Sequence, residues 1–136
     1  MIIVDENLND FRIMAAISAW LPGKVVSITS LRPSSQIKDD VIPTLLREAV
    51  KPTFVTINVT DFWKRVRPER NCCIIAVALP QDQGGEISKL LRRLFRLPDF
   101  KTKALRMGKI VHVTQTHIEY YERDRRIHSL PWPDQH

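Results

Sequence analysis

Carboxylates occur at three places in the first half of the chain, in positions where one edge of a sheet could collect them. Asp5-Glu6 follows the apolar run at residues 2–4, Asp39-Asp40 precedes a periodic apolar stretch, and Asp61 follows the apolar run at residues 53–57. Carboxylates that converge in a partly dry site repel one another, and Mg²⁺ or Mn²⁺ relieves that repulsion through hard oxygen ligands. Such an ion polarises a phosphodiester and activates water, so the chemistry expected here is metal-assisted hydrolysis.

The elements that must position these residues alternate between strand and helix. Short apolar runs predict strands at residues 2–4, 24–28, 53–57 and 72–79. Helical spacing predicts helices at residues 8–21, 39–49 and 86–97, with a short turn or helix at 61–66 and β-structure, in the form of a hairpin, at 109–122. This order predicts an α/β fold in three layers, with a mainly parallel central sheet, helices on both faces and a C-terminal β-hairpin extension.

The edge rule for parallel sheets brings the carboxylates together. Ligands of open α/β sheets bind outside the carboxyl ends of the strands. Asp5 and Asp61 follow the first and third predicted strands, and Asp39-Asp40 opens the helix between the second and third. These side chains are therefore expected to meet at that edge, although Asp39, Asp40 and Asp61 are also natural helix caps.

Size and composition indicate one domain of 136 residues, with a core at about 1–100, a β extension at about 105–123 and a tail at 124–136. The longest apolar run, residues 72–79, is far shorter than the roughly 20 residues of a membrane helix, so no membrane association is expected. Cys72 and Cys73 are neighbours on a predicted strand, where their side chains point to opposite faces, so they are poor partners for each other. The lack of a disulfide framework favours a reducing, cytoplasmic setting.

Positive charge is concentrated in the second half of the chain. Of the net charge of +6, residues 1–61 contribute −1 and residues 62–136 contribute +7. A basic surface attracts polyanions, which makes RNA a candidate partner, whereas solubility alone is the alternative. Two groups of cations are candidates for contacting an RNA backbone: a segment after Asp61 and a stripe at helical spacing, comprising Lys64, Arg65 and Arg67, and Lys89, Arg92, Arg93 and Arg96.

Three short motifs, in this order, resemble those of the PIN-like domain family. Val4-Asp5-Glu6-Asn7 resembles the motif after the first strand of small PIN-like proteins, and Asp39-Asp40-Val41-Ile42 resembles the acidic start of a PIN helix. Thr56-Ile57-Asn58-Val59-Thr60-Asp61-Phe62 is similar to the Thr-x-Asn-x-x-Asp-Phe motif of VapC-type PIN toxins. The resemblance covers about residues 1–80.

The resemblance implies a Mg²⁺- or Mn²⁺-dependent endoribonuclease, the toxin of a toxin–antitoxin pair. Its partners would then be RNA and an antitoxin protein, with a homodimer as one assembly state. It implies Asp5, Asp39 and Asp61 as metal ligands, Glu6 or Asp40 completing the set, and Asn58 orienting it. Asp39 keeps the apolar face of the following helix in register, whereas Asp40 gives the better spacing to Thr56, so both are retained.

Two other classes of function fit parts of the pattern. A non-catalytic PIN-like module would use the same fold to recruit a partner protein. A signalling receiver domain also has an acidic pair after its first strand. It would need a phosphoacceptor Asp at the end of the third strand, where this chain reads Thr56-Ile57-Asn58.

Overall fold

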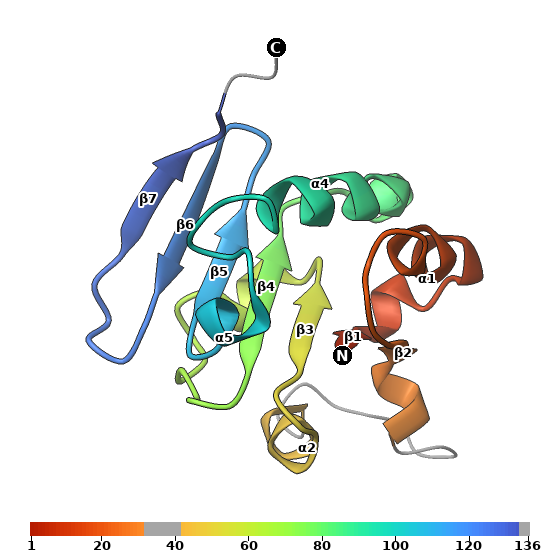
Figure 1. The fold of residues 1–136 in the computed structure, drawn as a ribbon, viewed down its shortest axis with the longest axis horizontal. Coiled ribbons are helices and arrows are strands. Elements are labelled where there is room, and N and C mark those ends of the chain that lie inside the picture. Colours follow the sequence, from red (N-terminus) through yellow and green to blue (C-terminus); the bar gives the residue numbers. More distant parts are fainter. Residues whose placement is uncertain (32–41, 134–136) are drawn as a thin grey trace.

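In the computed structural model, which describes residues 1–31 and 42–133, the chain forms an α/β fold around one mixed sheet (Figure 1). The described strands are β1 (Ile2–Val4), β2 (Val25–Ser27), β3 (Thr53–Thr56), β4 (Cys73–Val77), β5 (Ile110–Val113), β6 (His117–Tyr121) and β7 (His128–Pro131). The α-helices are α1 (Phe11–Ser18), α2 (Ile42–Glu48), α3 (Val59–Phe62), α4 (Ile87–Leu94) and α5 (Lys103–Arg106). Short 3₁₀ turns occupy Glu6–Leu8, Ile28–Leu31 and Gln81–Glu86.

The sheet has the order β2-β1-β3-β4-β5-β6-β7. The first five of these strands in spatial order are mutually parallel, and β6 and β7 continue the sheet antiparallel. This confirms the prediction of an α/β fold with a mainly parallel central sheet. The chain leaves β1 to form β2 on one side and returns with β3 on the other, so β1 and β3 flank a topological switch point, where ligands of such sheets bind.

Two apolar cores, one on each face of the sheet, make the fold three-layered. Alternate residues of each strand point to opposite faces, so Val4 and Ile75 enter one core while Ile3 and Ile74 enter the other. The first core holds the inner sides of α1 and α4, and the second those of α2 and α3. Because β1 and β4 are buried on both faces, their sequences are continuously apolar, and this property made them predictable. Strand β3 is equally buried but has a threonine at each end, Thr53 and Thr56.

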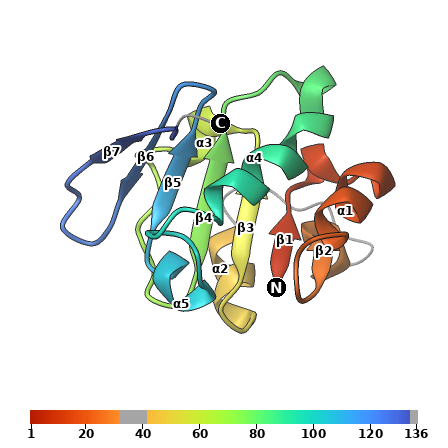
Figure 2. The ribbon, with the colours of Figure 1, turned by 45° about the horizontal axis from the view of Figure 1, so that its top comes forward.

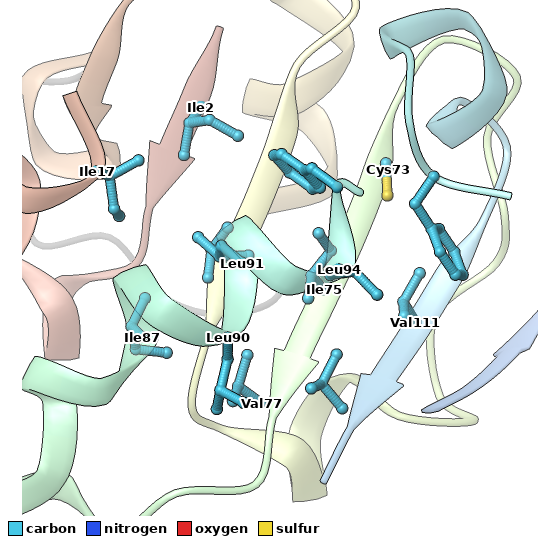
Figure 3. Packing of buried hydrophobic residues seen from close by; sticks show 14 of the residues in the cluster. Ile2, Ile17, Cys73, Ile75, Val77, Ile87, Leu90, Leu91, Leu94 and Val111 are labelled. Atoms are coloured by element: carbon cyan, nitrogen blue, oxygen red, sulfur yellow. The ribbon is translucent and has the colours of Figure 1, made fainter. Parts of the chain in front are cut away.

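Helix α4 lies across β3 and β4 (Figures 2 and 3). Its buried residues Leu90, Leu91 and Leu94 lie on one side of the helix, against Ile75 and Val77 of the sheet. The opposite side carries Lys and Arg side chains, as the helical spacing of the sequence predicts.

The first predicted helix is shorter than its hydrophobic pattern suggests. A 3₁₀ turn precedes it, and Asp10 begins α1 by accepting a hydrogen bond from the backbone amide of Arg12 at 2.7 Å. Phe11 lies within the predicted helix, and its apolar ring would be expected to face the core, yet it is 85% exposed, whereas Leu8 and Ile17 are buried. A strong cap at Asp10 fixes the helix start and turns Phe11 outward.

The C-terminal part of the chain is more ordered than its polar sequence suggests. Strand β5 pairs in parallel with β4 and so belongs to the central sheet. Strand β7 occupies His128–Pro131, inside the region predicted to be a tail, and pairs with β6. Next to it, the Trp132 indole donates a hydrogen bond to the Thr114 carbonyl at 2.7 Å, and Arg93 lies over the indole ring, 4.4 Å from its centroid. Local hydrophobic periodicity cannot predict these tertiary contacts.

Cys72 and Cys73 are both free and buried. Burial raises the pKa of the Cys72 thiol to about 11 and that of Cys73 to about 12. Both thiols therefore stay protonated near neutral pH and act as apolar packing groups, as expected for residues of a buried strand.

Within residues 1–31 and 42–133, the helices are all too short or too polar to cross a bilayer.

Ile75, in the middle of β4, should carry a large share of the stability. The side chain is fully buried, so Ile75→Ala should leave a cavity and lower the free energy of unfolding by about 3 kcal/mol. Ile127→Ala, at a residue that is 45% exposed, should change it by less than about 0.5 kcal/mol. Urea denaturation of the two variants measures both values, and equal losses would contradict the described core.

Candidate functional site

Asp5 lies at the carboxyl end of β1, beside β3 at the switch point of the sheet. Its backbone amide donates to the Val55 carbonyl at 2.9 Å, which continues the β1–β3 ladder by one residue. Its carboxylate is only 5% exposed and accepts two short hydrogen bonds, from the Thr56 hydroxyl at 2.6 Å and from the Glu6 amide at 2.8 Å. The strand pairing therefore fixes both the position and the orientation of this carboxylate.

The electrostatics of Asp5 are unusual for a structural residue. Burial is the largest influence and raises the pKa of Asp5, and the charges of Glu6 and Asp61 raise it further. The hydrogen bonds from Thr56 and Glu6 act in the opposite direction without cancelling this. Among the described residues, no Lys, Arg or His forms an ion pair with Asp5. A buried carboxylate with acidic neighbours and no cationic partner is a site that a cation or a proton would stabilise.

A chain of hydrogen bonds links Asp5 to Asp61. The Thr56 hydroxyl, which donates to Asp5, also accepts from the Asn58 amide at 2.9 Å. Asn58 caps α3: its side-chain oxygen accepts from the Asp61 amide at 3.3 Å, and its side-chain amide donates to the Asp61 carboxylate at 2.7 Å. Thus β3 and the first turn of α3 hold the carboxylate of Asp61, which is exposed, in a defined orientation near Asp5.

Asn7 adds a further oxygen to this edge. Its side-chain nitrogen lies 3.5 Å from the Asp5 carboxylate, and its side-chain oxygen is buried without a hydrogen-bond donor among the described residues. Buried polar atoms are nearly always paired in proteins. An unpaired acceptor next to a buried carboxylate is what a cation-binding edge would contain.

The oxygen atoms of this edge suit a hard divalent cation. Mg²⁺ is commonly held by one or two carboxylates and completes its shell with water and substrate oxygens, a pattern that Asp5 and Asp61 can supply. Across residues 1–31 and 42–133, no three His, Cys, Asp or Glu side chains come together as a metal-binding group. Glu6 is exposed beside Asp5, while Asp39 and Asp40 lie outside the described residues.

The basic segment after α3 is exposed and anchored. Lys64, Arg65 and Arg67 are exposed, and the Tyr121 hydroxyl holds their segment by donating to the Val66 carbonyl at 2.7 Å. The segment follows directly on the helix that carries Asp61, so its cations are close in sequence to the acidic edge. Trp63, the aromatic residue at the start of this segment, is half-buried.

Trp63 packs within the protein instead of projecting from it. Its ring centroid lies 5.1 Å from that of His112 and 5.2 Å from that of Tyr121.

The four cations of the basic stripe on and after α4 contact different parts of the protein. Lys89 lies 4.0 Å from the Glu86 carboxylate, and Arg93 covers the Trp132 ring. Arg92 and Arg96 line a cavity at the end of the sheet where β1 and β3 begin, opposite to Asp5. The four cations therefore do not form one continuous surface directed at the acidic edge.

The sequence pattern did not assign a role to two residues that contact Asp5. Thr56 appears in the sequence only as part of a motif, and Asn7 as the end of another. The position of Thr56 in its strand could have indicated this contact. Thr56 is the last residue of β3, the strand beside β1, and it follows Val55, the residue that pairs with Val4. A hydroxyl at that place, directly beside the residue that follows β1, can reach the Asp5 carboxylate.

Comparison of the chain with protein-family models, with curated proteins and with solved structures finds no match in any of the three. The functional assignment therefore depends on the residues and geometry of the site.

Removing the charge of Asp5 should change how stability depends on pH. An acid whose pKa is raised by folding is protonated more readily in the folded than in the unfolded chain, so stability falls as pH rises from the ordinary value of 3.8 past the folded-state pKa. Asp5→Asn abolishes this titration. The melting temperature of the wild type minus that of Asp5→Asn should therefore decrease by a few degrees between about pH 4 and pH 8 in the presence of a chelator.

Thermal unfolding followed by circular dichroism across that range measures the effect. The readout is how the melting-temperature difference changes with pH, and not its absolute size. Asn loses one of the two short hydrogen bonds, and that loss lowers the melting temperature of the variant by a similar amount at every pH. A melting-temperature difference that is constant or grows with pH would contradict a raised pKa at Asp5.

Proposed function

We propose that this chain is a PIN-like, Mg²⁺- or Mn²⁺-dependent endoribonuclease, the toxin of a toxin–antitoxin pair. Its metal ligands are Asp5 and Asp61, and the resemblance adds Asp39 or Asp40. The observation that supports this most strongly is the carboxylate of Asp5, which is 5% exposed, has no cationic partner among the described residues and lies at the switch point between β1 and β3.

The residues of the edge have distinct tasks in this proposal. Asp5 binds the ion from a fixed position, because the Thr56 hydroxyl and the Glu6 amide orient its carboxylate. Asn58 orients Asp61 through two hydrogen bonds. When bound, the ion would polarise the scissile phosphodiester and lower the pKa of the attacking water. Glu6, exposed next to Asp5, is available to accept a proton from that water.

Substrate binding would use the cations that follow α3. Lys64, Arg65 and Arg67 are exposed in a segment that Tyr121 anchors, and such groups contact phosphates without reading sequence. The cations of α4 contribute less, because only Lys89 is exposed on this helix away from the cavity, and it is paired with Glu86.

A non-catalytic binding module is the second candidate, and one observation favours it. Among the described residues, Asp5 is the only buried acidic side chain at this edge, and Glu6 and Asp61 are exposed. A single well-held carboxylate would bind metal weakly. In that case the same surface would recruit a protein partner and cleave no RNA.

Two features support the receiver-domain hypothesis. The parallel strand order β2-β1-β3-β4-β5 is one that receiver domains share, and an acidic pair follows β1. The residues at two functional positions argue more strongly against it. The end of β3 carries Thr56, whose hydroxyl is engaged with Asp5, where a phosphoacceptor carboxylate is required. After β5 the chain has Thr114 where a receiver would carry Lys.

The test is hydrolysis of single-stranded RNA by the purified chain with and without Mg²⁺ or Mn²⁺. Cleavage should require the ion. Asp5→Asn and Asp61→Asn should each lower kcat/KM by more than the roughly 10–100-fold cost of altering a residue that only supports a metal ligand. Asp124→Asn, an exposed acid in the connection between β6 and β7, is the matched control and should retain full activity.

Cleavage that persists with a chelator, or that survives Asp5→Asn, would exclude the proposed mechanism. If the wild type shows no cleavage with either ion, the binding-module alternative replaces it.

A further inference from the structure

A cavity of about 540 Å³ opens at the end of the sheet where the parallel strands begin. Ile2 of β1 and Thr53 of β3 form its floor, so it lies at the opposite end of these strands from Asp5. In Figure 2 the N-terminus and α5 both lie at this end of the sheet. Its volume falls within the roughly 300–1,000 Å³ of small-molecule sites.

The cavity is strongly cationic. Five basic side chains line it, contributed by α4, by α5 and by the segments that follow α4, and no acidic side chain is among its lining residues. These are Arg92, Arg96, Lys101, Lys103 and Arg106. In the part of the chain that the structure describes, none of the five forms an ion pair. Like charges gathered around one cavity repel one another, and an anion bound among them would relieve that repulsion.

Arg106 is the most deeply buried of the five cations. Its side chain is buried, with the residue only 9% exposed, and one guanidinium nitrogen donates to the Phe100 carbonyl at 2.9 Å. The guanidinium carbon lies 4.0 Å from the centroid of the Phe95 ring, but the Nε atom is buried without a partner among the described residues. Burial lowers the pKa of Arg106, which reflects the cost of placing its charge here. Buried Arg is normally paired with a carboxylate or phosphate.

One wall of the cavity is apolar and rigid. Trp20, Leu21 and Phe95 line it, and the Trp20 and Phe95 rings meet edge to face with centroids 5.8 Å apart. The Trp20 indole is fixed by a hydrogen bond to the Ser88 hydroxyl at 2.8 Å. A half-buried indole beside a cationic pocket offers a surface for a flat, uncharged group that is attached to an anion.

We propose that this cavity binds a nucleoside di- or triphosphate. The phosphates lie against Arg96, Lys103 and Arg106, and the base lies against the wall formed by Trp20 and Leu21. Five unpaired cations match a ligand with several negative charges, and the volume and the apolar wall exceed what inorganic phosphate would use. Binding here is independent of the proposed metal site at the opposite edge, because neither Asp5 nor Asp61 lines the cavity.

The test is calorimetric titration of the full chain with ATP, GTP and ADP, beside inorganic pyrophosphate and a short single-stranded RNA. We expect one nucleotide to bind per chain with a dissociation constant in the micromolar range. The double variant Arg96→Glu, Lys103→Glu changes two exposed side chains and should fold. It should weaken nucleotide binding by at least about tenfold. Arg126→Glu, an exposed cation in the β6–β7 connection, is the matched control and should bind like the wild type.

Trp20 supplies a second readout of the same event. Nucleotide binding should change the intrinsic tryptophan fluorescence, and Trp20→Phe should remove most of that change while Trp132→Phe retains it. Three outcomes would overturn the proposal: no nucleotide binds, whether or not the RNA does; pyrophosphate binds as tightly as the nucleotides; or Arg126→Glu weakens binding as much as the double variant.

Discussion

The hydrogen bond from the Thr56 hydroxyl to the Asp5 carboxylate is the contact on which the acidic edge depends. It joins the ends of β1 and β3 at the switch point of the sheet, and it exists only because the register sets Val4 opposite Val55. A shift of one residue would turn Asp5 toward the other face and separate it from Thr56. The position of the carboxylate is therefore a consequence of strand pairing, and strand pairing is a consequence of the two apolar cores.

Burial of this contact makes the ionised form of Asp5 unfavourable. A carboxylate that is 5% exposed and has no cationic partner among the described residues destabilises the fold in its ionised form. Two short hydrogen bonds reduce that cost, yet the pKa of Asp5 remains raised. The ionised form of Asp5 is thus disfavoured at the place where ligands of parallel sheets bind. Such an arrangement is typical of functional sites, where stability is sacrificed for chemistry.

Local sequence was sufficient to predict the central strands and the position of Asp5 at the end of the first one. Continuous apolar runs identify strands buried on both faces, and the change from Val4 to Asp5 marks a strand end. It was insufficient where a tertiary contact decides the outcome. The Asp10 cap shortens α1, and pairing with β6 makes a strand of His128–Pro131. The role of Thr56 also depends on which strand lies next to β1, which periodicity alone does not specify.

The two ends of the parallel strands differ in charge. The carboxyl end carries Asp5, Glu6 and Asp61, whereas the cavity at the amino end is lined by five basic side chains. The sequence pattern treats the cations of α4 as one stripe, but the fold assigns Arg92 and Arg96 to the cavity and stacks Arg93 on Trp132. Two of the four cations of the stripe thus belong to a different site from the acidic one.

The proposed binding of a divalent ion by Asp5 is tested most directly by electron paramagnetic resonance of Mn²⁺ titrated into the chain. The signal of free Mn²⁺ should stay below that of a protein-free sample, by an amount that corresponds to one bound ion per chain at saturation. Asp5→Asn should abolish this deficit while Asp124→Asn retains it. Equal Mn²⁺ binding by the wild type and Asp5→Asn, or no binding by the wild type, would contradict the claim.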